Sequence, residues 1–262
     1  MNNYLNIFSR VFTFVFAWLV IVQTTVAYAD VSTRWNAPLN DTQTLAKEVL
    51  DKNNIITDLS TLVKTHFNSS AAIDIENLTI KLTTSGTPGI NTKKPELILP
   101  YDFITQAIRA QAELEETQQD ALERGFDLIE YTLYHLLGHL LAGDPSPDAD
   151  DQAESLSTWL MIKSWPNGGE QWHSDASAFG RASQLLDGSL QDYWHSHSLY
   201  KSRQTQINCW ILGSNPDQYE PLLKQVLEPE ERRTKCVAAW QALNKSSLET
   251  LAPLLKENST LR

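Results

Sequence analysis

The chain has 262 residues, of which 42% are hydrophobic, and its 21 basic and 32 acidic side chains give a formal net charge of −11. This length and composition suffice for a hydrophobic core and predict a globular protein. Because nucleic-acid binding needs clustered Lys and Arg, the acidic balance excludes that class of partner.

The N-terminus has the features of a secretory signal. Arg10 precedes an apolar run from Val11 to Val22, and the small residues of Ala27-Tyr28-Ala29 follow. A membrane anchor is the alternative, but the run is shorter than the ~20 residues that a spanning helix needs. We therefore expect a cleaved signal peptide over residues 1–29, an exported protein, periplasmic or secreted, and no stable membrane span after cleavage.

Residues 30–74 are expected to form an N-terminal helical segment. Apolar residues recur at helical spacing between Leu45 and Val63, and the pattern is interrupted at Asn53-Asn54. This pattern predicts two short helices or one kinked helix.

Two extended runs follow at the start of the region from 75 to 262. Leu78, Ile80 and Leu82 alternate with polar residues, and Glu96–Pro100 follows the turn-rich Ser85–Gly89. These runs predict a small β-hairpin or the edge of a sheet.

The rest of the chain reads as helices. The pattern is helical from Asp102 to Leu141 and again from about Asp148 to Trp165, with Gly and Pro between the two. Pro216 and Pro229, each followed by acidic residues, are typical of helix starts. The predicted fold is α+β and mainly α.

The most informative segment is His135-Leu136-Leu137-Gly138-His139. Two histidines four residues apart on one helix point the same way, so both imidazoles can reach one metal ion. Zinc peptidases use this spacing as H-E-x-x-H, in which the glutamate takes a proton from the zinc-bound water. Leu136 stands at the glutamate position here and cannot transfer a proton. The histidine pair by itself is also compatible with two packed core histidines.

A second pair of candidate ligands lies on the next predicted helix. Asp150 and Glu154 are four residues apart and therefore share one face. In gluzincins a following helix supplies E-x-x-x-D, with Glu as third zinc ligand and Asp bonded to a ligand histidine. The acids are exchanged here, so either could be the third ligand, and a solvated acidic helix start is the alternative.

Together these segments resemble a bacterial family of metallopeptidase-like domains of unknown function. The family typically shows H-E-L-G-H, then E-D-x-A-D, then H-S-L, R, C-W, G and P, then P-E-E-R and C. The matching positions in this chain, over roughly residues 75 to 256, are His135–His139, Asp150–Glu154, His197-Ser198-Leu199, Arg203, Cys209-Trp210, Gly213, Pro216, Pro229–Arg232 and Cys236. The resemblance implies a zincin-like fold of gluzincin type, one zinc ion and a secreted peptidase-like role.

Three departures from the family pattern affect the expected activity. Leu136 replaces the general base, Asp150 replaces the ligand Glu, and the connection after His139 is shorter. General acid-base action contributes ~10² to 10⁴-fold to a rate, so we expect little or no peptidase activity.

Three other residues also have predicted roles. His197 is a candidate oxyanion stabiliser, supported by the resemblance alone, with helix packing as its alternative. Cys209 and Cys236 are expected to form a disulfide, because an exported chain with two cysteines usually pairs them; two independent buried thiols are the alternative.

The leading hypothesis is an exported, zinc-binding metallopeptidase-like domain, covering residues 75–262, whose catalysis is impaired. A peptide or protein ligand fits this hypothesis. Two alternatives stay open, namely an active metallopeptidase with another general base and an interaction scaffold whose histidines only pack.

Overall fold

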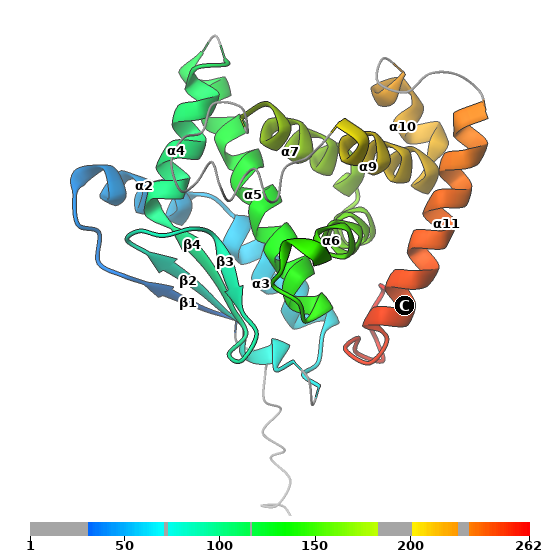
Figure 1. Cartoon of the computed structure of the whole chain (residues 1–262), viewed down its shortest axis with the longest axis horizontal. Helices are drawn as coiled ribbons and strands as arrows, with labels where there is room; N and C mark the ends of the chain where they lie inside the picture. Colours follow the sequence, from blue (N-terminus) through cyan, green and yellow to red (C-terminus); the bar gives the residue numbers. More distant parts are fainter. Residues whose placement is uncertain (1–30, 71–72, 116, 183–200, 225–230) are drawn as a thin grey trace, which may run out of the picture.

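The computed structural model describes residues 31–70, 73–115, 117–182, 201–224 and 231–262. It is a mainly helical α+β fold in which one small sheet lies at one side of the molecule and α5 runs past it through the centre (Figure 1). The predicted signal peptide lies outside the described residues. No helix within the described ranges combines the length and hydrophobicity needed to cross a bilayer.

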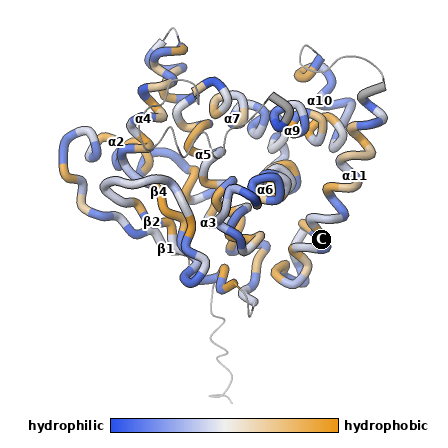
Figure 2. Tube along the Cα trace, in the orientation of Figure 1, coloured by the Kyte–Doolittle hydropathy of each residue, from blue (hydrophilic) through white to orange (hydrophobic). Residues whose placement is uncertain are grey.

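The sheet has four strands in the order β1-β2-β4-β3. The strands are β1 (Ser32–Trp35), β2 (Thr79–Thr83), β3 (Gly89–Asn91) and β4 (Glu96–Pro100). β1, β2 and β4 are parallel, whereas β3 pairs antiparallel with β4. Ile80 and Leu82 of β2 and Leu97 and Leu99 of β4 are fully buried, and Figure 2 places the hydrophobic β4 beside α5.

The sequence predicted the strands at 78–83 and 96–100, but their pairing differs from a hairpin. β2 and β4 are parallel neighbours, and the hairpin joins β3 to β4. The chain between them runs beyond the position of β4, forms the edge strand β3 and turns back, so β4 becomes a central strand. β1 was not predicted, and it pairs across the predicted boundary at 74/75.

The N-terminal helices match the pattern read from the sequence. α2 (Asp41–Lys52) and α3 (Ile55–His66) are separated at Asn53-Asn54, as the interruption indicated. Asn40 caps α2, since its side chain accepts a hydrogen bond from the backbone N–H of Gln43.

The helical stretch predicted from Asp102 to Leu141 is two helices. α4 (Tyr101–Ala112) ends before α5 (Gln118–Ala142), because Thr117 accepts a hydrogen bond from the backbone of Asp120 and starts a new helix. Gly143 then ends α5 in the left-handed conformation, with φ 75°.

The remaining helices complete the core around α5. α6 (Asp150–Ser164) follows a short 3-10 turn, and α7 (Gly168–Ala182) packs against both α5 and α6. α9 (Lys201–Ser214), α10 (Pro216–Leu223) and α11 (Glu231–Leu251) form the C-terminal side of the molecule. α10 begins at Pro216, as the sequence predicted, and Asn215 caps it.

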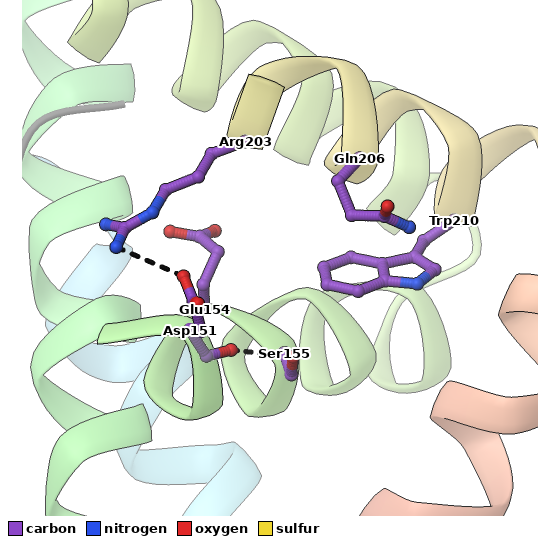
Figure 3. Close-up of a pocket in the computed structure, with 6 residues that line it drawn as sticks. All are labelled: Asp151, Glu154, Ser155, Arg203, Gln206 and Trp210. Carbon is purple, nitrogen blue, oxygen red and sulfur yellow. Dashed lines mark hydrogen bonds and ion pairs between the residues drawn. The ribbon is translucent and has the colours of Figure 1, made fainter. Parts of the chain in front are cut away.

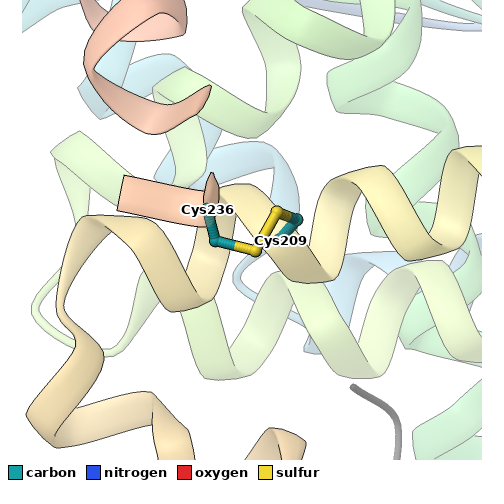
Figure 4. Close-up of a disulfide and its surroundings, with 2 residues drawn as sticks. All are labelled: Cys209 and Cys236. Atoms are coloured by element: carbon teal, nitrogen blue, oxygen red, sulfur yellow. A yellow bond between two sulfur atoms is a disulfide. The ribbon is translucent and has the colours of Figure 1, made fainter. Parts of the chain in front are cut away.

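The predicted disulfide is confirmed. Cys209 of α9 and Cys236 of α11 are bonded, with an S–S distance of 2.01 Å and a Cα–Cα distance of 4.8 Å (Figure 4). The disulfide joins α11 to α9, and α9 contacts α6.

Candidate metal centre

Two helices supply the candidate ligands, and a glycine lets them approach. His135 and His139 lie on α5, and Asp150 and Glu154 lie on α6. A Cβ at Gly138 would lie 2.2 Å from the carbonyl oxygen of Ala153, so any larger residue would separate the two helices. The four side chains are buried, with at most 3% exposure.

Three donor atoms converge on one point. Nε2 of His139 lies 3.2 Å from Nε2 of His135 and 3.1 Å from Oδ1 of Asp150. The third side of this triangle, from Nε2 of His135 to Oδ1 of Asp150, is 3.7 Å. Ligands of a tetrahedral ion with bonds of ~2.0 to 2.1 Å lie about 3.3 Å apart, so the triangle has the size of one face of such a site. His135, His139 and Asp150 are the cluster that could hold a metal ion among the described residues.

The outer nitrogens of both rings face acceptors. Nδ1 of His139 lies 2.9 Å from the backbone oxygen of Asp144. A carbonyl oxygen only accepts hydrogen bonds, so Nδ1 of His139 carries the proton and Nε2 presents a lone pair. Nδ1 of His135 lies 3.4 Å from Oε2 of Glu154, which favours the same tautomer. With Nδ1 of both rings protonated, the two Nε2 atoms 3.2 Å apart need a cation between them, either a proton, which makes their contact a hydrogen bond, or a metal ion.

The carboxylates of Asp150 and Glu154 give the cluster the negative charge that attracts such a cation. Burial lowers the pKa of His135, but hydrogen bonds and charges from Asp150 and Glu154 outweigh burial and raise the pKa to about 9. Oε1 of Glu154 is also buried without a hydrogen-bond partner in the described part of the chain. The donor set of two imidazoles and carboxylate therefore fits a divalent metal, which would displace the proton from the inner nitrogen.

Arg203 of α9 holds the second oxygen of Asp150. Its Nη1 donates to Oδ2 of Asp150 at 3.0 Å, and its Nη2 lies 3.1 Å from Oδ1 of Asp151. This leaves Oδ1 of Asp150 toward the two histidines. The interactions with Asp150 and Asp151 also raise the pKa of Arg203, despite the opposing effect of burial.

Leu136 lies on the same turn of α5 as His135 and is 2% exposed. Its side chain packs in the hydrophobic core. An apolar group at this position has no atom that accepts a proton.

A hollow of about 490 Å³ adjoins the cluster between α6 and α9 (Figure 3). Glu154 lines both the hollow and the cluster. The other lining residues are Asp151 and Ser155 of α6 and Arg203, Gln206 and Trp210 of α9. The candidate metal centre therefore lies next to a space large enough for a ligand.

The structure brings together His135, His139, Asp150 and Glu154, the four ligand candidates from the sequence. His197 lies outside the described residues, so its role as an oxyanion stabiliser stays a prediction.

Three features of the centre were missed in the sequence. The hydroxyl of Tyr131 donates to Oε2 of Glu154, the backbone of Asp144 accepts from His139, and Gly138 sets the helix separation. Tyr131 had a signal that was available, since it precedes His135 by four residues and therefore shares its helix face.

Comparison with known proteins gives one match. A family model described as "Putative metallopeptidase", a family of unknown function, matches residues 35–251. No curated protein and no solved structure matches the chain. The family match confirms the resemblance read from the sequence.

Proposed function

Since the chain belongs to this metallopeptidase family, we propose that it is a zincin-like domain that binds one zinc ion and has little or no peptidase activity. His135, His139 and Asp150 are the ligands in this proposal, and Glu154 orients His135 from behind its ring. A helix carrying both histidines, packed on a small sheet and followed by a helix that supplies the acids, supports the gluzincin-type reading.

One observation carries the proposal, namely the triangle of Nε2, Nε2 and Oδ1 atoms with sides of 3.1 to 3.7 Å. Two histidines that only pack in a core do not need a buried carboxylate oxygen that faces both of their inner ring nitrogens. The same triangle supports Asp150 over Glu154 as the third ligand, because Glu154 approaches the outer nitrogen of His135.

In a zincin the bound zinc polarises a carbonyl and activates water. This chain supplies the binding groups, but Leu136 supplies no base to take the proton from that water. The expected result is a domain that retains the metal and the adjoining hollow while losing most of the hydrolytic rate. Gln206, Ser155 and Trp210 give that hollow hydrogen-bonding groups and an apolar wall, which suits a peptide or protein ligand.

We also place the protein outside the cytoplasm in this proposal. The bond between Cys209 and Cys236 supports export, because disulfides persist in oxidising compartments. Expression with the native N-terminus, followed by fractionation and mass determination of the mature chain, tests both export and cleavage near Ala29. Retention of the full-length chain in the cytoplasm would contradict it.

Metal content tests the proposed site. The mature protein, purified from its export compartment without a histidine tag, should contain about one zinc per chain by mass spectrometry. His135→Ala should contain none, while His173→Ala, a histidine of α7 bonded to Asn208, is the matched control and should keep its zinc. Wild-type protein without stoichiometric metal would favour the interaction scaffold.

Peptidase activity tests the role assigned to Leu136. A mixed-peptide cleavage screen should detect no chelator-sensitive cleavage by the wild type, and Leu136→Glu should produce it. Chelator-sensitive cleavage by the wild type would instead favour an active enzyme with another general base. Leu137→Glu places the same charge one residue away and serves as the control.

A further inference from the structure

Glu154 lies on the side of the His135 ring that faces away from the candidate metal centre. One of its carboxylate oxygens contacts both Tyr131 and His135. Oε2 of Glu154 accepts a hydrogen bond from the hydroxyl of Tyr131 and lies 3.4 Å from Nδ1 of His135. All three side chains are buried, with exposures of 1 to 3%. The shared oxygen therefore joins Tyr131 to the outer nitrogen of His135.

Tyr131 is itself fixed from two directions. Its ring stacks on the His135 ring with a centroid distance of 5.8 Å and an interplanar angle of 12°. On another side it meets Trp172 at 4.9 Å and Phe179 at 4.4 Å, both from α7. Trp172 in turn donates from Nε1 to Thr158 of α6 at 2.8 Å. The tyrosine thus stands where α5, α6 and α7 meet.

We propose that Tyr131 is a positioning residue for the metal centre, which holds Glu154 on the outer nitrogen of His135 and away from the metal. This inference rests on the proposed zinc site. Tyr131 acts on the centre through the Glu154 carboxylate.

The physical need for such a residue follows from the length of Glu154. A glutamate has more rotatable bonds than an aspartate, so fixing its side chain in one position costs more conformational entropy. Glu154 also lines the hollow, so its carboxylate has an open space into which it could rotate. The hydroxyl of Tyr131 opposes that rotation, since it binds the same oxygen that faces His135.

The consequence for His135 concerns its tautomer. With Glu154 held in place, its carboxylate faces Nδ1 at 3.4 Å, which favours a proton on Nδ1 and leaves Nε2 to the metal. Without the hydroxyl, Glu154 is released from one of its two partners, and its carboxylate can leave Nδ1 or enter the coordination sphere. Either change alters the affinity for metal and the ligand field at the metal.

Tyr131→Phe in the full mature chain tests this inference. Zinc affinity is measured by competition with a chromophoric chelator, and the ligand field by the visible absorption spectrum of the cobalt(II)-substituted protein. Because loss of an outer-shell partner typically costs 10 to 100-fold in metal affinity, we expect a loss of at least about tenfold and an altered cobalt spectrum.

Tyr134→Phe is the matched control. Tyr134 is also fully buried on α5, and its hydroxyl accepts a hydrogen bond from Nε1 of Trp165 at 3.0 Å, away from the metal centre. This variant loses one partly buried hydrogen bond between neutral groups, so its metal-free form should be destabilised no more than that of Tyr131→Phe. It should keep the wild-type zinc affinity and cobalt spectrum.

The outcomes separate the inference from the proposed function. Wild-type affinity and spectrum in Tyr131→Phe would overturn the inference alone, whereas a wild type that binds neither zinc nor cobalt would overturn both. If Tyr131→Phe does not fold, Glu154→Asp replaces it, since a carboxylate shorter by one methylene cannot bridge both partners. The same loss of affinity and spectral change are expected there, and their absence would contradict the inference.

Discussion

Two polar clusters lie one after the other along helix α5. They differ in how the negative charge of their buried carboxylates is neutralised. The metal cluster consists of His135, His139, Asp150 and Glu154. The carboxyl cluster precedes it and consists of Asp127 and Glu130 of α5 with Gln171 and Asp175 of α7. Both contain carboxylates in a region of low dielectric constant, where an uncompensated charge is costly.

The carboxyl cluster has too few donors for its acceptors. Nε2 of Gln171 lies 3.3 Å from Asp127, 3.3 Å from Glu130 and 2.8 Å from Asp175. An amide nitrogen has two hydrogens, so it cannot satisfy three carboxylates. Arg124 compensates Asp127 at 2.9 Å, while Oδ2 of Asp175 has no hydrogen-bond partner in the described ranges.

The difference between the clusters lies in the kind of donor atom. In the metal cluster two inner ring nitrogens and a carboxylate oxygen face one point, an arrangement that suits a metal cation. In the carboxyl cluster the acids surround an amide, and burial raises the pKa of Glu130 and of Asp175 so that these two carboxyls hold protons instead. Burial, together with the charges of Asp127 and Asp58, raises the pKa of Glu130 from 4.5 to about 7. Buried acids that pack against one helix can therefore be neutralised by different cations.

Metal removal should produce the largest effect, and only in the metal cluster. With free zinc a thousandfold above its Kd, binding to the folded state adds about 4 kcal/mol to the free energy of unfolding. A chelator should remove this contribution from the wild type, as measured by denaturant unfolding. His139→Ala should not respond to the chelator, and an equal response would contradict the site.

A substitution that pushes α5 away from α6 should also affect metal binding and leave the carboxyl cluster unchanged. Gly138→Ala places a methyl group against the backbone oxygen of Ala153, and overpacking of this kind costs about 3 kcal/mol. We expect lower stability and weaker zinc binding, measured by unfolding and by chelator competition.

Gly180→Ala in α7 is the control for that substitution. Among the described residues, its new Cβ would meet Oε1 of Gln204 at 3.7 Å, an ordinary van der Waals contact, so the variant should be neutral or more stable by up to ~1 kcal/mol. Unchanged zinc affinity in Gly138→Ala would mean that the helix separation does not set the metal geometry.

The carboxyl cluster should respond to pH. Glu130 has a raised pKa in the folded state, so between pH 4.5 and about 7 the folded protein holds a proton that the unfolded chain has released. The folded state binds more protons there, and stability therefore falls as pH rises through this window. Glu130→Gln removes the penalty and should raise the free energy of unfolding by about 2 kcal/mol at pH 8, with little change at pH 4.

Glu123→Gln is the control for the pH experiment, because Glu123 lies exposed on the same helix. The difference in free energy of unfolding between Glu123→Gln and the wild type should not show the increase from pH 4 to pH 8 that is expected for Glu130→Gln. A Glu130→Gln variant that is no more stable than the wild type at pH 8 would show that the carboxyl cluster carries no charge penalty.

The sequence predicted the metal cluster better than the carboxyl cluster for a physical reason. His135 and His139, like Asp150 and Glu154, are pairs at i and i+4, so each pair shares a helix face whatever the tertiary structure. The carboxyl cluster depends on how α7 docks on α5, and Gln171 and Asp175 have no signal that identifies α5 as their partner.

The sheet and the helix boundaries show the same limit. The alternation in β2 and the break between α2 and α3 are local patterns, and both were predicted correctly. The parallel pairing of β2 with β4 depends on the path of the chain around β3, which no local pattern records. Similarly, the choice between Asp150 and Glu154 required the position of Nδ1 of His135, since both acids lie on the same face of α6.

The smallest effect on stability and zinc affinity is expected from a substitution at Asp151. This residue follows Asp150 in sequence, but its side chain is exposed to solvent. Its side chain is 85% exposed, while Asp150 is fully buried, and Arg203 contacts both. Exposed ion pairs contribute 0 to ~1 kcal/mol, so Asp151→Asn should change the free energy of unfolding by less than about 0.5 kcal/mol and leave zinc affinity intact. Asp150→Asn should abolish stoichiometric zinc, measured on the same preparations by mass spectrometry. If the two variants lost zinc equally, Arg203 would need both acids to hold the ligand, and burial alone would not distinguish them.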